Sequence, residues 1–274
     1  MSLGLIPSFS NNLIRNFNHL MYADDLILVT TTSRKAARNV YFCLNIYAQL
    51  FGQFPNQNKS EIFVPHWFNN RVTSSICSIL NFKLGKTPFT YLGVLISPKR
   101  LALAQFDSMI HRLNRAISKW GKTKLSKASK SILINRILMT VPIYYLSVYP
   151  IPDSVLSKLS SGARKFLWAN YEQGKGLPLV NWDVITSSKA EGGLGIRNLL
   201  TAKHSLMAKN LINFLNRHQS IWVDILHLKY GNHNFWTMNA PPNCSTFFKG
   251  LCSNANAIKP FLWINCVNPD TISL

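Results

Sequence analysis

The sequence predicts an α+β fold, with short strands concentrated in the first 98 residues and helices after them. In the first part, short runs of apolar, β-branched and aromatic residues are bounded by polar or glycine-containing turns. From residue 99 onward, apolar residues recur at alternating steps of three and four, which places them on one face of a helix. We therefore expect a mixed region at 1–98 followed by a mainly helical region.

The chain carries a large positive charge. Its 274 residues include 30 Lys and Arg against 10 Asp and Glu, a formal net charge of +20. This balance indicates a polyanionic partner, most simply nucleic acid. Five cysteines without paired spacing argue against a disulfide framework and favour a reducing compartment. We therefore expect an intracellular protein of the nucleus or cytoplasm rather than a secreted one.

The stretch HLMYADDLILV at 19–29 predicts a β-hairpin with two adjacent carboxylates, Asp24 and Asp25, at its tip. Residues on both sides are of the types that suit a half-buried strand. Like charges at this spacing repel, and a cation between them would remove the repulsion. Magnesium prefers hard oxygen ligands of this kind. The alternative is a solvated turn, because Asp is common in turns.

Three further elements are predicted in the first region. A helix is expected over 34–50 and ends at Gly52. A short strand is expected at 62–64, and the segment 89–97 predicts a strand or hairpin in which Gly93 marks a bulge or a close approach. The helix face is formed by Ala37, Val40, Leu44 and Ala48.

The helical region begins with a two-faced helix over 106–120. Its apolar face is formed by Phe106, Ile110, Leu113, Ile117 and Trp120. The opposite face carries Arg112, Arg115, Lys119 and Lys122. Only Asp107 offsets the ten Lys or Arg residues between Lys99 and Arg136. Because the balancing acids are missing, we expect phosphate contact rather than an ordinary solvated face.

Helices are also expected from Pro152 onward, at 201–217 and at 222–230, followed by a loosely structured tail. The loop at 192–195 lacks the Lys-Ser/Thr ending of a phosphate-binding loop. Cys244, Cys252, Cys266, His227 and His233 are residue types that can bind zinc. Their spacings match no close-paired ligand arrangement, which disfavours zinc.

An ordered series of short motifs carries a family resemblance. The motifs are Tyr22-Ala23-Asp24-Asp25, Gly52-x-x-x-Asn56-x-x-Lys59-Ser60, Tyr91-Leu92-Gly93-Val94, Trp120, Ser126-x-x-Ser129-Lys130, Pro142-Ile143-Tyr144-Tyr145, Phe166-Leu167-Trp168 and Gly192-Gly193-Leu194-Gly195-Ile196. Together they resemble the reverse transcriptases of plant non-LTR (LINE-type) retrotransposons. The resemblance covers most of the chain. It implies a partial palm at 1–98, a basic helical thumb at 99–170 and a helical connector with a loosely structured tail at 171–274.

The resemblance implies an activity and a set of site residues. In that family, paired Asp residues hold Mg²⁺ or Mn²⁺ for RNA-directed DNA polymerisation by two-metal phosphoryl transfer. This implies a catalytic and metal-binding role for Asp24 and Asp25, and a role for Lys59 beside the leaving pyrophosphate. It also implies primer contacts for Tyr22 and for Tyr91-Leu92-Gly93. The implied contacts to the nucleic-acid backbone are Arg112, Arg115, Lys119, Lys122, Lys124, Lys127 and Lys130.

Alternatives remain open for some of these residues. Lys59 is also consistent with a solvated lysine near the start of a strand. The segment Tyr91–Val94 is equally consistent with an ordinary core hairpin.

The sequence departs from the family's metal site. That site needs a further palm carboxylate upstream of the hairpin, and residues 1–23 contain no Asp and no Glu. Two carboxylates alone leave a metal pair under-coordinated. We therefore expect a truncated reverse transcriptase that is inactive alone, with unpaired palm strand edges that invite association. In the family, a ribonuclease H domain lies farther toward the C-terminus.

Two other functions compete with this hypothesis. The first is a non-catalytic protein whose basic helices hold RNA, DNA or an RNA–DNA hybrid. The second is an interaction domain whose basic face binds an acidic protein or a membrane surface. The apolar stretch 132–151 does not favour a membrane span, because Asn135, Arg136 and Pro142 interrupt it.

Overall fold

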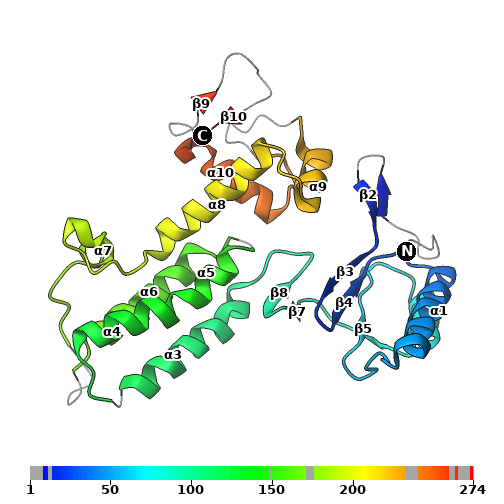
Figure 1. Cartoon of the computed structure of the whole chain (residues 1–274), viewed down its shortest axis with the longest axis horizontal. Coiled ribbons are helices and arrows are strands. Elements are labelled where there is room, and N and C mark those ends of the chain that lie inside the picture. Colours follow the sequence, from blue (N-terminus) through cyan, green and yellow to red (C-terminus); the bar gives the residue numbers. More distant parts are fainter. Residues whose placement is uncertain are drawn as a thin grey trace. The chain divides into compact units, whose positions relative to one another are not determined.

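The computed structural model describes residues 9–11, 14–121, 123–148, 150–170, 176–232, 240–258, 263–264 and 272–273. These residues form a mixed α and β structure that is mostly helical (Figure 1). The mixed fold class expected from the sequence is thereby confirmed. The chain divides into two compact units, Met1–Lys99 (unit 1) and Arg100–Leu274 (unit 2). The finer division into palm, thumb and connector stays a prediction.

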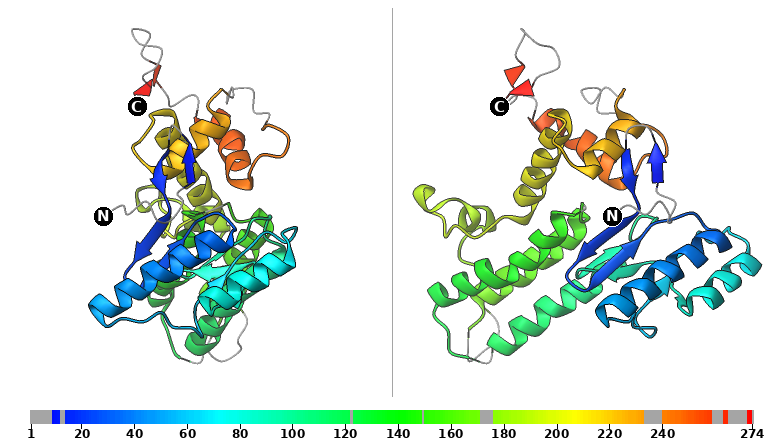
Figure 2. Two further views of the ribbon diagram at one scale, coloured as in Figure 1. Left: turned by 90° about the vertical axis from the view of Figure 1, so that its right-hand side faces the viewer. Right: turned by 45° about the vertical axis from the view of Figure 1, so that its right-hand side comes forward.

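Unit 1 contains two helices that lie side by side, α1 (Arg34–Phe51) and α2 (Asn70–Leu80) (Figure 2). Helix α1 begins at Ser33, whose hydroxyl oxygen accepts a hydrogen bond from the Ala36 N–H over 3.1 Å. It ends at Gly52, whose φ of 68° suits glycine. The predicted helix over 34–50 is confirmed. Its buried residues are Ala36, Ala37, Val40 and Ala48.

The described strands of unit 1 pair two by two. The antiparallel pairs are β1 (Phe9–Asn11) with β2 (Ile14–Phe17), β3 (His19–Tyr22) with β4 (Asp25–Leu28), and β7 (Phe89–Tyr91) with β8 (Val94–Ile96). One parallel pair joins β5 (Glu61–Ile62) to β6 (Lys83–Leu84). The strand expected at 62–64 therefore begins one residue earlier and is shorter.

The expected role of Gly93 was wrong. Leu92 and Gly93 form the two-residue turn between β7 and β8, with φ values of 48° and 79°. Positive φ at both central residues is the requirement of a type I′ hairpin turn. A Cβ built on Gly93 would meet no atom within 4 Å. Gly93 therefore turns the chain, and it marks neither a bulge nor a close approach.

Unit 2 is built from helices. These are η1 (Leu103–Phe106), α3 (Asp107–Gly121), α4 (Lys127–Leu133), the π-helical turn η2 (Ile134–Leu138), α5 (Thr140–Leu146), α6 (Asp153–Trp168), α7 (Trp182–Thr186), η3 (Lys189–Glu191), α8 (Leu199–Leu215), α9 (Ile221–Tyr230) and α10 (Thr246–Ile258). The short strands β9 (Trp263–Ile264) and β10 (Ile272–Ser273) pair with each other. Helices α6, α8 and α9 confirm those predicted from Pro152 onward, at 201–217 and at 222–230. None of the helices in the described ranges has the length and apolar character needed to cross a bilayer.

The tail was expected to be loosely structured, but it contains helix α10. Phe248, Leu251, Cys252 and Ala255 lie on one face of this helix and are fully buried. They pack into a core cluster with residues of α8 and α9, among them Met207, Leu211, Phe214, Leu226 and Tyr230. Helix α10 follows the paired prolines Pro241 and Pro242, and its burial depends on this packing.

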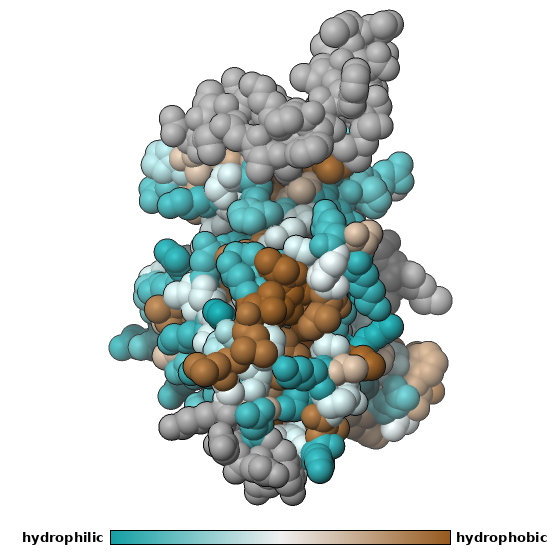
Figure 3. All heavy atoms as spheres, turned by 90° about the vertical axis from the view of Figure 1, so that its left-hand side faces the viewer, coloured by the Kyte–Doolittle hydropathy of each residue, from teal (hydrophilic) through white to brown (hydrophobic). Residues whose placement is uncertain are grey.

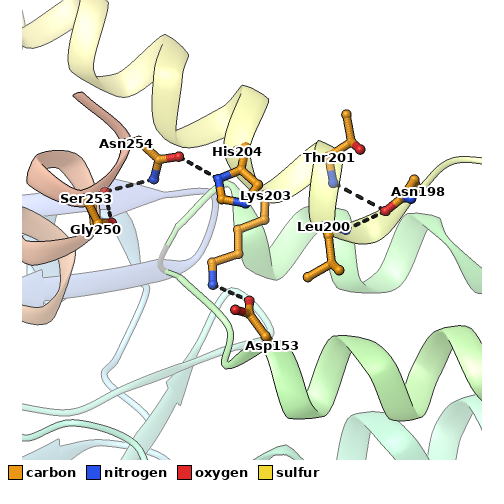
Figure 4. A network of polar contacts seen from close by, with 9 residues as sticks. All are labelled: Asp153, Asn198, Leu200, Thr201, Lys203, His204, Gly250, Ser253 and Asn254. Atoms are coloured by element: carbon orange, nitrogen blue, oxygen red, sulfur yellow. Dashed lines mark hydrogen bonds and ion pairs between the residues drawn. The ribbon is translucent and has the colours of Figure 1, made fainter. Parts of the chain in front are cut away.

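Polar contacts join α8 to its neighbours (Figure 4). The Lys203 ammonium lies 2.6 Å from an Asp153 carboxylate oxygen at the start of α6. His204 Nδ1 lies 2.7 Å from Asn254 Oδ1 on α10, and Asn254 Nδ2 donates to the Gly250 carbonyl oxygen over 2.9 Å. Because the Asn254 amide nitrogen faces Gly250, its oxygen accepts from His204, which assigns a proton to Nδ1.

Candidate functional site

The hairpin predicted at 19–29 is confirmed as β3 and β4. The register pairs Tyr22 with Asp25, so Ala23 and Asp24 form the turn. Ala23 has a φ of 50°, a left-handed conformation that costs a residue with a Cβ roughly 1–3 kcal/mol. The strain is local to the tip that carries the carboxylates.

Asp24 and Asp25 are both exposed. Within the described part of the chain, neither carboxylate accepts a hydrogen bond or forms an ion pair. They offer hard oxygen ligands suited to one Mg²⁺ that keeps water and substrate phosphate in its remaining positions. The described residues bring no third His, Cys, Asp or Glu into a metal-holding group with them. The donor set therefore fits part of a metal site.

Lys59 is exposed on a turn that Asn56 shapes. The Asn56 side-chain oxygen accepts from the Lys59 N–H over 3.2 Å, and its carbonyl oxygen accepts from the Ser60 N–H over 2.8 Å. The turn leads into β5, and Phe63 after it stacks on Phe89 of β7 with ring centroids 4.1 Å apart. This contact ties the Lys59 turn to the β7–β8 hairpin. Asn56, a residue of the second motif, shapes this turn through its side chain and its carbonyl oxygen.

The residues proposed to contact a primer lie on two hairpins. Tyr22 is exposed at the end of β3, and Tyr91 is half-buried at the end of β7. Leu92 and Gly93 are exposed at the tip of the second hairpin. No described strand of one hairpin pairs with a strand of the other. A shared primer contact therefore stays a prediction.

Helix α3 has the two faces predicted for it. Phe106, Met109 and Leu113 are buried, and α3 packs against α6. A Cβ built on Gly162 of α6 would lie 3.1 Å from a Leu113 methyl carbon, so the helices approach closely there. Sequence reasoning missed Met109. The remaining predicted residues of this face, Ile110, Ile117 and Trp120, are half-buried.

The opposite side of α3 is basic and open. Arg112, Arg115 and Lys119 are all exposed, and we call these three residues the basic face. Their spacing of three and four places them together on the helix. Among the described residues, none of the three forms an ion pair. Lys124, on the segment after α3, is also exposed, whereas Lys122 lies outside the described residues.

Lys127 and the two serines of its motif have local contacts at the start of α4. The Ser126 hydroxyl oxygen accepts from the Ser129 N–H over 3.1 Å and caps the helix. Lys127 is exposed, and its ammonium lies 4.7 Å from the centre of the Trp168 ring, within cation–π range. Lys127 is therefore partly engaged within unit 2 while it remains accessible.

Lys130 lies differently from the other predicted phosphate contacts. Its side chain is buried, and its ammonium donates to the Ala169 carbonyl oxygen over 2.5 Å at the end of α6. Burial lowers the pKa of Lys130 below its ordinary value, and the nearby charge of Lys127 lowers it further. The structure thus directs this ammonium to a helix end and not to the basic face.

Two of the residue types that can bind zinc, His227 and Cys252, have other contacts in the described part of the chain. His227 Nε2 lies 2.8 Å from the Phe214 carbonyl oxygen, and its ring stacks on Phe214 at 4.1 Å. Cys252 is buried in the core, and burial, with a smaller contribution from Cys244, raises its pKa to about 11. Cys266 and His233 lie outside the described residues.

No family model matches the chain. Two proteins of Arabidopsis thaliana are similar to parts of it. The one named "Putative ribonuclease H protein At1g65750" is 31% identical over 132 residues, which cover 48% of this chain and 21% of that protein. The one named "Uncharacterized mitochondrial protein AtMg00310" is 27% identical over 97 residues, which cover 35% of this chain and 63% of that protein. The matches thus span less than two thirds of each relative's own length.

Proposed function

We propose that this chain is a reverse-transcriptase-like protein from a non-LTR retrotransposon and that it binds nucleic acid through the basic face. The observation that carries the proposal is the set of exposed cations at Arg112, Arg115 and Lys119, without acidic partners among the described residues. Each cation that contacts a phosphate releases counterions, which gives strong binding that weakens with salt. Such contacts position a duplex without reading its sequence, as a polymerase requires.

The hairpin supplies the second part of the proposal. Mg²⁺ or Mn²⁺, when bound, would supply neutralisation of the charge on the triphosphate and the attacking oxygen. Asp24 and Asp25 would hold the ion, and their exposure leaves room for phosphate ligands. Because the described residues offer no third carboxylate beside them, we propose that the 274-residue chain alone does not polymerise DNA.

The comparisons support this proposal through the name of one relative. In the family that the motifs resemble, a ribonuclease H domain accompanies the reverse transcriptase. Similarity to a protein named for ribonuclease H is therefore consistent with an origin in such an element.

A non-catalytic nucleic-acid-binding protein is the second candidate. It is favoured by the metal ligands available at the hairpin. Among the described residues, Asp24 and Asp25 form no metal-holding group with a third His, Cys, Asp or Glu. In this function the basic face alone is required. Primer extension separates the two candidates when it is measured on a chain that also carries the missing palm carboxylate. Only the first candidate predicts that this chain gains polymerase activity.

Binding is tested by fluorescence anisotropy of a labelled RNA–DNA hybrid across a salt series. The variant Arg112→Gln/Arg115→Gln/Lys119→Gln should flatten the slope of log affinity against log salt by about two to three units, because each lost phosphate contact removes roughly 0.7–0.9. The matched control is Lys158→Gln/Lys209→Gln/Lys249→Gln, which removes the same charge from exposed positions on α6, α8 and α10. If both variants keep the wild-type slope, the basic face does not bind nucleic acid.

A further inference from the structure

Helix α1 carries basic, aromatic and amide side chains together on one side, opposite its buried residues. These side chains recur at steps of three, four and seven residues, which place them in two neighbouring rows along the helix. All of them are exposed. We call this side the α1 face, and it consists of Arg34, Lys35, Arg38, Tyr41, Phe42 and Asn45.

Two aromatic rings of the α1 face are open to solvent. Tyr41 and Phe42 are 52% and 53% exposed. Within the described part of the chain, neither ring stacks on another ring. Tyr47 and Phe51, on the opposite side of the same helix, instead lie against each other with ring centroids 4.8 Å apart. An exposed ring of this kind can receive a nucleic-acid base, because every base has a π face.

The charge of α1 is unbalanced in the same place. Arg34, Lys35 and Arg38 lie in the first two turns, and residues 34–51 contain no Asp and no Glu. Among the described residues, none of the three cations forms an ion pair. The N-terminal end of a helix already carries a partial positive charge, so these cations lower the stability of the helix. Helix stability therefore does not explain them, whereas a bound anion would be stabilised by both the cations and the helix end.

Two other exposed surfaces lack this combination of rings and cations. Helix α3 carries the basic face, but none of its residues is an exposed Phe, Tyr or Trp. Helix α7 lies at the left of Figure 1, the side that faces the viewer in Figure 3, where apolar side chains gather in the middle of the view. The exposed apolar side chains on and beside α7, such as Val184 and Leu194, are aliphatic. They offer no ring on which a base could stack.

We propose that the α1 face binds single-stranded nucleic acid, with bases stacked on Tyr41 and Phe42 and phosphates beside the three cations. Aromatic rings next to cations hold single strands without reading their sequence. A duplex fits less well, because its paired bases stack on one another and leave no face for a side chain. A membrane surface requires a continuous apolar face, whereas the α1 face offers two rings among polar side chains. The proposal concerns unit 1 and does not rest on binding by the basic face of unit 2.

The test is fluorescence anisotropy of labelled oligo(dT), a strand that does not pair with itself. Tyr41→Ala/Phe42→Ala should weaken its binding roughly fivefold or more for each ring lost. The slope of log affinity against log salt should not change, because the rings carry no charge. The matched control is Tyr47→Ala/Phe51→Ala, which removes the same two side-chain types from the opposite side of α1 and should bind like the wild type. Wild-type affinity in the first variant, or an equal loss in the control, would overturn the proposal.

A second measurement uses the unmodified chain. Oligo(dT) with 5-iodouracil in place of one thymine crosslinks to neighbouring aromatic side chains on irradiation, and mass spectrometry of peptides should locate the crosslink at Tyr41 or Phe42. A crosslink found only outside the α1 face would contradict the proposal. So would a variant Tyr41→Ala/Phe42→Ala that loses binding to anionic lipid vesicles and keeps binding to oligo(dT), because the α1 face would then contact a membrane surface.

The α1 face and the basic face can be separated by combining their variants. The loss caused by Tyr41→Ala/Phe42→Ala should be the same in a chain that also carries Arg112→Gln/Arg115→Gln/Lys119→Gln, because the two sets lie on different helices in different units. A loss that disappears in this second chain would show that the rings act only through the basic face, which refutes the inference. Intact oligo(dT) binding with an unchanged salt slope for the RNA–DNA hybrid would refute only the proposed function.

Discussion

The side-chain amide of Asn135 is hydrogen-bonded to the backbone of a loop 60 residues later, at Gly195, over 3.0 Å. Asn135 lies in the π-helical turn η2, a rare form in which the chain widens by one residue. Its oxygen also accepts the Arg197 N–H, so one side chain satisfies a donor and an acceptor of the loop. The contact joins η2 to the loop that follows η3.

The Asn135 contact predicts a measurable loss of stability. Asn135→Ala should lower the free energy of unfolding by about 1–3 kcal/mol, because it leaves the Gly195 carbonyl and the Arg197 N–H without their partner. Urea denaturation followed by circular dichroism measures this change. The control Asn114→Ala, at an exposed position on α3, should stay within about 0.5 kcal/mol of the wild type. Equal stability of both variants would contradict a structural role for the amide.

Polymerase activity of the 274-residue chain should be undetectable. Asp24 and Asp25 should bind Mg²⁺ or Mn²⁺ weakly, because a two-metal centre must neutralise both the attacking oxygen and the leaving group. The measurement is primer extension on an RNA template with each metal, with Asp24→Asn as the control. Extension that disappears in this control would demonstrate a complete site and refute the prediction. We expect no extension in either protein.

Because of Lys130, the free energy of unfolding should depend on pH in the range below 10.5, the ordinary pKa of lysine. Its folded-state pKa is lowered, so in this range the unfolded state binds more protons than the folded state. Stability therefore rises as pH increases from the folded-state pKa toward 10.5, where the cost of the buried charge disappears. Lys130→Met removes this contribution, so the wild type should gain stability relative to the variant as pH rises from the folded-state pKa of Lys130 toward 10.5.

The pH prediction needs an exposed lysine for comparison. Lys124 is exposed on the segment after α3, and Lys124→Met should keep the wild-type pH dependence. Thermal unfolding at a series of alkaline pH values compares the three proteins. A Lys130→Met curve parallel to the other two would show that the ammonium is not buried at the end of α6.

Cys252 should resist alkylation in the folded protein. Its pKa is raised to about 11, so at pH 8 only about one thiol in a thousand is the reactive thiolate. The thiols of Cys43, Cys77 and Cys244 are half-buried and should react first with iodoacetamide. Mass spectrometry of peptides over time distinguishes them, and denaturant should abolish the difference. Early labelling of Cys252 would contradict the packing of α10 in the core.

Much of the local structure was determined by the sequence alone. Helix α1 follows from the period of its small apolar residues, with Ser33 before it and Gly52 after it, because helix faces and caps depend on residues a few positions apart. The hairpin at Asp24 and Asp25 and the two faces of α3 follow in the same way. Since Arg112, Arg115 and Lys119 are spaced to share one side of α3, their exposure was predictable from the apolar residues opposite them.

Only the tertiary structure decided which residues with the same local pattern became buried. Lys130 continues the run of basic residues, yet it ends against Ala169, 39 residues later, because α4 packs beside α6. Helix α10 has a modest sequence pattern, and its formation depends on the core that α8 and α9 offer to Phe248 and Leu251. Asn135 is a case of the same kind, because its partners Gly195 and Arg197 lie about 60 residues later. Contacts between residues far apart in the chain decide burial, and no local spacing records them.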